Sequence, residues 1–152
     1  MSTDNYVDNE PTDGSFPLFA GGAVAPLVVA DNDFAPVARA AGDLQNDLQM
    51  VTDARPTLGN SIPAGAKLAV LIGTVGQSSL IDGLVSSKKL DVGALSDKGQ
   101  ARWETFVIQV VSRPAAGVDQ ALVIAGSDKR GTVYGIYDLS RRIGVSPWYF
   151  WD

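Results

Sequence analysis

The residues best suited to chemistry in this sequence lie in the segment Gly126-Ser-Asp-Lys-Arg-Gly-Thr132. Its two glycines and its threonine match the letters of a phosphate-binding loop, but Lys129 precedes the second glycine, whereas that loop needs the lysine directly after it. The functional interpretation is that Lys129 and Arg130, at a helix start that follows a strand, present cationic groups to a carboxylate ligand or to a partner domain.

The same segment has a structural interpretation. Ser127 or Asp128 caps the helix that follows, because both side chains can accept a hydrogen bond from a helix-start N–H group. Gly131 and Gly135 then allow that helix to lie close against a sheet. On residue types alone, the structural interpretation is the better supported of the two.

A second glycine-containing turn, Gly73-Thr-Val-Gly-Gln-Ser-Ser79, has the strand–turn–helix context of a phosphate site. Its spacing fits neither the dinucleotide fingerprint nor a Walker A loop, which favours an ordinary turn. A nucleotide-binding domain stays as a third hypothesis and predicts a thermal shift with nucleotides. Ser86-Ser-Lys-Lys89 fits S-x-x-K by letters, but the companion motifs of those enzymes are missing.

Complete catalytic machinery is not evident in these residues. The sequence has no His and no Cys, which excludes Ser-His-Asp and Cys-His catalysis, thiolate zinc sites and disulfides. The Asp and Glu residues are scattered, and no pair stands out as the flanking carboxylates of a glycosidase. We therefore predict no catalytic residue, no metal site and no cofactor in this chain.

Aromatic residues gather at the end of the sequence, in Trp148-Tyr-Phe-Trp151. Such bulk is unfavourable in water and is typical of cores and interfaces. We expect Trp148 and Trp151 to contact another domain, with stacking on sugar rings as the alternative, and we expect the natural polypeptide to continue past Asp152.

Composition fits a single globular domain, with 152 residues of which 45% are hydrophobic and 19% charged. The net charge of −5 is concentrated in residues 1–14, which carry four acids and no base. The nearly neutral remainder argues against nucleic-acid binding, and no apolar run is long enough to span a membrane. Residues 1–14 are predicted to be a disordered acidic tail.

The elements that would position these residues follow from hydrophobic periodicity. Continuous apolar runs predict buried strands, and steps of three and four predict helices. Asp33 is the expected N-cap of the first helix, Arg55-Pro56 its expected end, and the last helix is expected to bury Val133, Ile136, Tyr137, Ser140 and Ile143. The predicted strands are 26–30, 67–73, 103–111 and 121–125, and the predicted helices are 34–54, 78–85 and 129–143. Strands 103–111 and 121–125 are expected to pair across the turn 114–117, and 86–100 has no assigned structure.

Three segments together resemble the N-terminal domain of glycoside hydrolase family 115, the xylan α-1,2-glucuronidases. They are Ile72-Gly-Thr-Val-Gly-Gln-Ser-Ser-Leu-Ile-Asp82, Trp103-Glu-Thr-Phe-Val-Ile-Gln-Val-Val111, and the long stretch from Ala121 through Gly-Ser-Asp-Lys-Arg-Gly-Thr to Ser146-Pro-Trp-Tyr149. The resemblance covers roughly residues 16–152. One position departs from the family pattern, because Phe150 stands where a second Trp is usual.

The resemblance implies a large enzyme that removes glucuronic acid, or its 4-O-methyl ether, from glucuronoxylan with inversion. Its catalytic carboxylates would lie in a following (β/α)8 barrel that this chain lacks. The domain is similar to the small domain that precedes the barrel in β-hexosaminidases and in the other α-glucuronidase family. Their Arg-Gly-x-x-Tyr-Gly helix start matches Arg130-Gly-Thr-Val-Tyr-Gly135.

These observations combine into one hypothesis. The chain is expected to be an α/β domain of α+β type, a mixed β-sheet flanked by helices, with a tail (1–14), an accessory domain (15–146) and an aromatic linker (147–152). The barrel of the same polypeptide is the expected partner, with glucuronoxylan or aldouronic acids bound by the full enzyme, which would be secreted or periplasmic. Asp128, Lys129, Arg130, Trp148 and Trp151 are the candidates for substrate or interface contacts. The alternative is a carbohydrate-binding module for uronic-acid-decorated xylan.

Overall fold

The computed structural model describes residues 7–8, 15–144 and 149–151. The helices are α1 (Ala35–Thr52), α2 (Ser79–Ser86) and α3 (Lys129–Ile143), with a 3₁₀ turn at Gly93–Leu95. The strands of the main sheet are β5 (Leu27–Val29), β6 (Leu58–Gly59), β7 (Leu68–Thr74), β10 (Phe106–Ser112) and β11 (Gln120–Gly126). Shorter strands are β1 (Val7–Asp8), β2 (Ser15–Pro17), β3 (Phe19–Ala20), β4 (Ala23–Val24), β8 (Ser96–Asp97), β9 (Gln100–Ala101) and β12 (Tyr149–Trp151).

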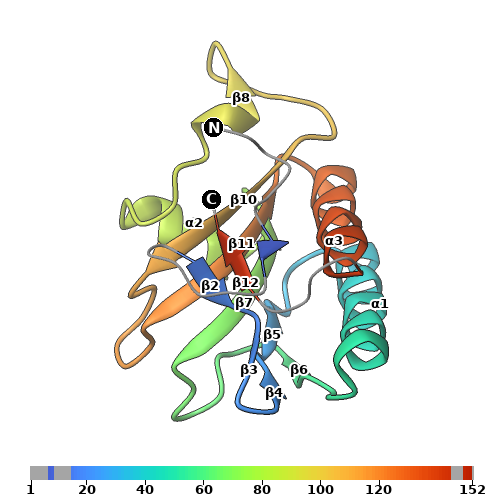
Figure 1. Ribbon diagram of the computed structural model, residues 1–152. Coiled ribbons are helices and arrows are strands. Elements are labelled where there is room, and N and C mark those ends of the chain that lie inside the picture. The colour runs from blue at the N-terminus through green and yellow to red at the C-terminus, as the bar shows by residue number, and fades with distance from the viewer. Residues whose placement is uncertain (1–6, 9–14, 145–148, 152) are drawn as a thin grey trace.

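The main sheet has the strand order β10-β11-β7-β5-β6. Strands β11, β7, β5 and β6 are parallel, and β10 pairs antiparallel with β11 across the predicted turn. Helices α1 and α3 cover one face of the sheet and α2 covers the other (Figure 1). The predicted fold class, a mixed sheet flanked by helices, is confirmed.

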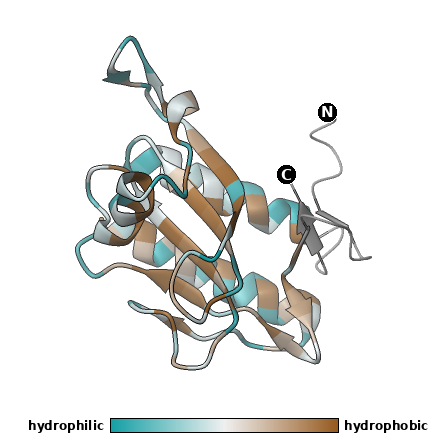
Figure 2. Cartoon of the chain, turned by 90° about the vertical axis from the view of Figure 1, so that its left-hand side faces the viewer, coloured by the Kyte–Doolittle hydropathy of each residue, from teal (hydrophilic) through white to brown (hydrophobic). Residues whose placement is uncertain are grey.

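The core lies on both faces of the sheet, which explains the continuous apolar runs of β7 and β11. Val70 and Ile72 pack with α1 and α3, whereas Ala69 and Leu71, which alternate with them, pack with α2. Figure 2 shows these apolar strands at the centre of the molecule, with the more polar hairpin of β8 and β9 projecting from it. The segment 86–100, which the sequence left unassigned, supplies most of that hairpin, whose second strand ends at Ala101.

Helix α1 corrects two predictions. Its N-cap is Phe34, not Asp33, and the Asp33 carboxylate instead accepts hydrogen bonds from the N–H groups of Phe34 (2.8 Å) and Thr74 (2.9 Å). The helix ends at Thr52, before Arg55-Pro56, because Asp53 adopts a left-handed backbone with φ 61° and its N–H binds the carbonyl of Gln49.

Two further expectations change in the second half of the chain. Strand β10 begins at Phe106 and not at Trp103, because Glu104 has φ 54°, which interrupts an extended backbone. Helix α3 buries Thr132, Ile136, Leu139 and Ile143, whereas Tyr137, predicted on the buried stripe, is exposed. Its hydroxyl donates to Asp43 of α1 instead.

The two ends of the chain meet in a small separate sheet. The backbone of β12 pairs with β1 on one side and with β2 on the other. Most of the predicted tail and linker, residues 1–6, 9–14, 145–148 and 152, lies outside the described residues, and both stay predictions. Across the described part of the chain, no helix is both long and apolar enough to cross a membrane.

Candidate functional site

The carboxyl ends of the parallel strands are where open α/β sheets bind ligands, most often at the point where the strand order reverses. Here that point lies between β5 and β7, because the chain moves from β5 to β6 on one side and returns to β7 on the other. The loops after β5, β7 and β11 all lead to helices at this edge (Figure 1).

At the switch between β5 and β7, backbone N–H groups already bind the chain's own carboxylates. The N–H of Thr74 donates to Asp33, and the N–H of Gly76 donates to an oxygen of Asp82 at 2.8 Å. These are the donors that a phosphate would need, and two negative groups already occupy them. The geometry agrees with the sequence argument that Gly73–Ser79 is an ordinary turn.

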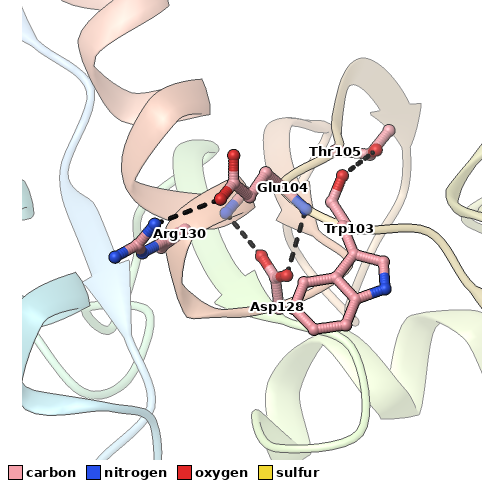
Figure 3. A network of polar contacts seen from close by, with 6 residues as sticks. Trp103, Glu104, Thr105, Asp128 and Arg130 are labelled. Carbon is pink, nitrogen blue, oxygen red and sulfur yellow. Dashed lines mark hydrogen bonds and ion pairs between the residues drawn. The ribbon is translucent and has the colours of Figure 1, made fainter.

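The start of α3 is the better-built feature of this edge (Figure 3). Asp128 is the N-cap, and one carboxylate oxygen accepts from the N–H of Gly131 at 2.7 Å. Its other oxygen accepts from the N–H of Glu104 at 3.0 Å, in the loop that leads into β10. Asp128 thus joins two segments of chain, and the prediction that it caps the helix is confirmed.

Close packing around Asp128 depends on glycine. A Cβ atom on Gly131 would lie 2.2 Å from the carbonyl oxygen of Thr105, and one on Gly126 would lie 2.2 Å from the nitrogen of Thr132. A Cβ on Gly135 would lie 2.7 Å from a methyl group of Ile124 in β11. The prediction that glycine lets the helix approach the sheet is confirmed for Gly135, whereas Gly131 lets it approach the loop before β10.

A buried pair of hydroxyl groups locks the same helix to β7. Thr74 and Thr132 are almost fully buried, and their Oγ1 atoms lie 2.8 Å apart. Thr132 Oγ1 also contacts the carbonyl oxygens of Gly73 (3.4 Å) and Asp128 (3.0 Å). The first turn of α3 is therefore fixed to β7 by these hydroxyl contacts and to the loop before β10 by close packing.

Two cations project from this rigid base. Arg130 Nη1 lies 3.1 Å from Glu104 Oε1, and both side chains are exposed. Lys129 Nζ lies 5.9 Å from the centre of the Phe34 ring, a cation–π contact. The structure thus pairs Arg130 with Glu104, a residue that the sequence argument did not select, and places Lys129 against Phe34.

Trp103 is the other residue that sequence reasoning missed. It is 87% exposed and directly precedes Glu104, and its carbonyl oxygen accepts from Thr105 Oγ1 at 2.8 Å. The sequence signal that could have identified Trp103 is its place at the end of a polar stretch, where an aromatic side chain has no core to enter. From the sequence, we instead assigned this residue to the beginning of a strand. Trp148 is outside the described residues, and of Trp151 only the backbone is described.

A second polar surface lies between α1 and α3, where an open hollow of about 570 Å³ is lined by Arg39, Asp43, Arg55 and Tyr137 among others. Tyr137 donates to Asp43 at 2.7 Å, and this hydrogen bond is the main reason why the pKa of Tyr137 is raised. Nη1 of Arg55 binds Asn46 and Gln49 of α1, and Nη2 binds Gln45. These contacts fix the chain that leaves α1.

Most carboxylates in the described part of the chain have structural partners. Asp33, Asp82, Asp91 and Asp128 bind backbone N–H groups, and Asp138 binds Arg141 and Arg142. No group of three or more acidic residues that could hold a metal occurs among the described residues.

Comparison with solved structures places this fold in glycoside hydrolases. One similar structure is a family GH115 4-O-methyl-α-glucuronidase, BtGH115A, described as specific for decorated arabinogalactans. It is 29% identical, with a TM-score of 0.62, over 89% of this chain and 15% of that one. A second is CpGH84D, 11% identical with a TM-score of 0.58, over 100% of this chain and 23% of that one, a likeness of fold alone.

The chain therefore spans under a quarter of either structure. No protein-family model and no curated protein matches the sequence. The domain is of the kind associated with glycoside hydrolases, and the likeness to the GH115 enzyme is a likeness to one domain of it.

Proposed function

We propose that this chain is a non-catalytic domain of a glycoside hydrolase that removes glucuronic acid or 4-O-methylglucuronic acid side groups from a polysaccharide. The observation that carries the proposal is the 29% identity to a 4-O-methyl-α-glucuronidase over 89% of this chain. The carboxylates support it, since Asp33, Asp82 and Asp128 each accept a hydrogen bond from a backbone N–H group. The chemistry would then take place on a catalytic domain outside these 152 residues.

The partner in this proposal is a (β/α)8 barrel that follows in the same polypeptide. Support comes from the aromatic segment Trp148–Trp151, whose sequence is typical of an interface, and from the small share of each similar structure that this chain covers. Lys129 and Arg130, fixed at the start of α3, are the proposed contacts to the barrel or to the edge of its active site. A secreted or periplasmic location goes with a polymeric substrate.

The uronic acid side group is the part of the substrate that this proposal specifies. The sequence resemblance favours glucuronoxylan, whereas the similar GH115 structure is described as specific for decorated arabinogalactans. Both substrates fit a domain that does not itself carry the catalytic groups. The main-chain sugar is therefore decided by assay, with both polysaccharides offered to the same enzyme.

The test begins with the source reading frame on both sides of these residues. The expected result is several hundred further codons with alternating strand and helix patterns. The full-length protein should release the uronic acid from one or both polysaccharides, and the 152-residue chain should release none. A frame without a catalytic domain would overturn the proposal. Binding of an aldouronic acid by such a free-standing chain would instead support a carbohydrate-binding module.

A further inference from the structure

The most exposed segment of the described chain is the arm, which we define as residues 96–104. Every residue of the arm is exposed, and it includes the projecting hairpin of β8 and β9. Trp103 lies near its end and is 87% exposed, an unfavourable position for a large indole in water. The arm contributes little to the core, so its shape needs another explanation.

The arm is held firmly at both ends. Where it leaves the body, the N–H of Arg102 donates to the carbonyl of the buried Leu95 at 2.8 Å. Where it returns, Ser127 N–H donates to Thr105 O at 2.8 Å, and Thr105 N–H donates to Ser127 Oγ at 3.1 Å. Trp103 is thus attached to a backbone fixed against the end of β11, which lowers the entropy lost when its ring binds a ligand.

The surroundings of Trp103 distinguish between two kinds of ligand. The arm carries no second large apolar side chain, and the charged groups Glu104, Asp128 and Arg130 gather at its return end (Figure 3). A protein interface has an apolar core depleted of charge. A single indole with a polar rim instead suits a ligand that has one flat apolar face and many hydroxyl groups, which describes a pyranose ring.

We propose that Trp103 is the stacking platform of a carbohydrate-binding site that takes a neutral pyranose ring. The inference rests on the proposed function, because it assigns a polysaccharide contact to a domain of a polysaccharide-degrading enzyme. A neutral ring is favoured over a uronic acid because the charges beside the indole cancel. Arg102 and Glu104 flank Trp103 in the chain, and Asp128 and Arg130 both bind Glu104, so the site offers no net positive charge to a carboxylate.

The test uses the 152-residue chain and the indole N–H signals of its tryptophans in a ¹H–¹⁵N NMR spectrum. Trp103→Phe identifies the Trp103 signal by removing it. Titration with xylohexaose and with a β-1,3-linked galactohexaose should shift that signal saturably for at least one of the two sugars. Trp103→Ala should weaken binding about tenfold in calorimetry, and Trp103→Tyr should keep most of it.

Controls separate binding from folding. Trp103→Ala should unfold at the wild-type temperature, because the side chain is exposed. Tyr134→Ala removes another exposed aromatic residue, on α3 and outside the arm, and should leave binding unchanged. An oligosaccharide bearing 4-O-methylglucuronic acid should bind no more tightly than xylohexaose.

Four results would overturn this inference: no saturable shift with either neutral sugar, unchanged affinity in Trp103→Ala, binding that requires the uronic acid, or an effect of Trp103→Ala only on association with the catalytic domain. The last would make the arm a protein contact. Failure here is distinguishable from failure of the proposed function, which depends on the reading frame and on uronic acid release.

Discussion

Gly131→Ala is the sharpest perturbation of the helix start at α3. An added Cβ would lie 2.2 Å from Thr105 O and 2.9 Å from Thr105 N, and both are backbone atoms that cannot rotate away. Helix α3 would have to move away from the loop before β10. That movement would stretch the hydrogen bond from the Glu104 N–H to Asp128 and the paired bonds between Ser127 and Thr105.

The magnitude follows from three terms. Overpacking costs about 1–3 kcal/mol, and the weakened hydrogen bonds to the loop cost about 1 kcal/mol. The higher helix propensity of alanine returns about 1 kcal/mol. We therefore expect the free energy of unfolding to fall by about 2 kcal/mol, which for a domain of this size lowers the melting temperature by about 4–8 °C.

The assay is urea denaturation followed by circular dichroism, with thermal unfolding alongside. Gly83→Ala in α2 is the matched control, because a Cβ there meets nothing within 4 Å. It should leave stability unchanged or raise it by up to about 1 kcal/mol. If Gly131→Ala proved as stable as Gly83→Ala, the close approach of α3 to Thr105 would be refuted.

Two further predictions concern polar contacts of α3. Thr132→Val should reduce the free energy of unfolding by about 1–3 kcal/mol, because it leaves the Thr74 hydroxyl buried without its partner. Adding Thr74→Val to it should restore part of that loss, and additive losses in urea denaturation would contradict the coupling. Tyr137→Phe should cost no more than about 1 kcal/mol at pH 7, since Tyr137 is half-exposed. Because the folded-state pKa of Tyr137 is raised above its unfolded value, chiefly by its hydrogen bond to Asp43, this stabilisation is present below pH 10 and is lost as pH rises through the folded pKa. Stability measured from pH 7 upward should therefore converge for wild type and variant, and a gap that widened above pH 10 would contradict the assignment.

The parts of the fold that the sequence predicted well are those decided by burial. The runs 67–73 and 121–125 are apolar at every position because both faces of β7 and β11 are covered, so their pattern allows few alternatives. The turn between β10 and β11 followed in the same way from two β-rich segments flanking Pro114–Gly117. The two-residue strand β6 is too short to leave such a pattern.

The errors have a different physical origin, because they depend on contacts that are distant in sequence. Asp33 has the residue type of an N-cap, but its partner Thr74 lies on another strand, and no local pattern reveals that pairing. Trp103 has high β propensity, yet the left-handed backbone of Glu104 interrupts the extended chain, so β10 begins only after it. The contact of Glu104 with Arg130 joins segments 26 residues apart, so half of the candidate site was visible only in three dimensions.

The first turn of α3 also conflicts with local helix stability. A helix N-terminus carries partial positive charge, and a cation there costs about 0.3–1 kcal/mol. Helix α3 nevertheless begins with Lys129 and Arg130 and has no acid in its first turn, whereas Arg141 and Arg142 in its last turn are favourably placed.

The contacts of the two cations offset a cost of about this size. An exposed ion pair such as that of Arg130 with Glu104 contributes about 0–1 kcal/mol, and the contact of Lys129 with Phe34 is of similar size. A rule of local stability that is broken at one point and compensated by other contacts is typical of functional positions. The exposed indole of Trp103 is likewise not explained by folding alone. The two cations at the start of α3 and Trp103 therefore meet at one edge of the sheet, where Glu104 and Asp128 join them.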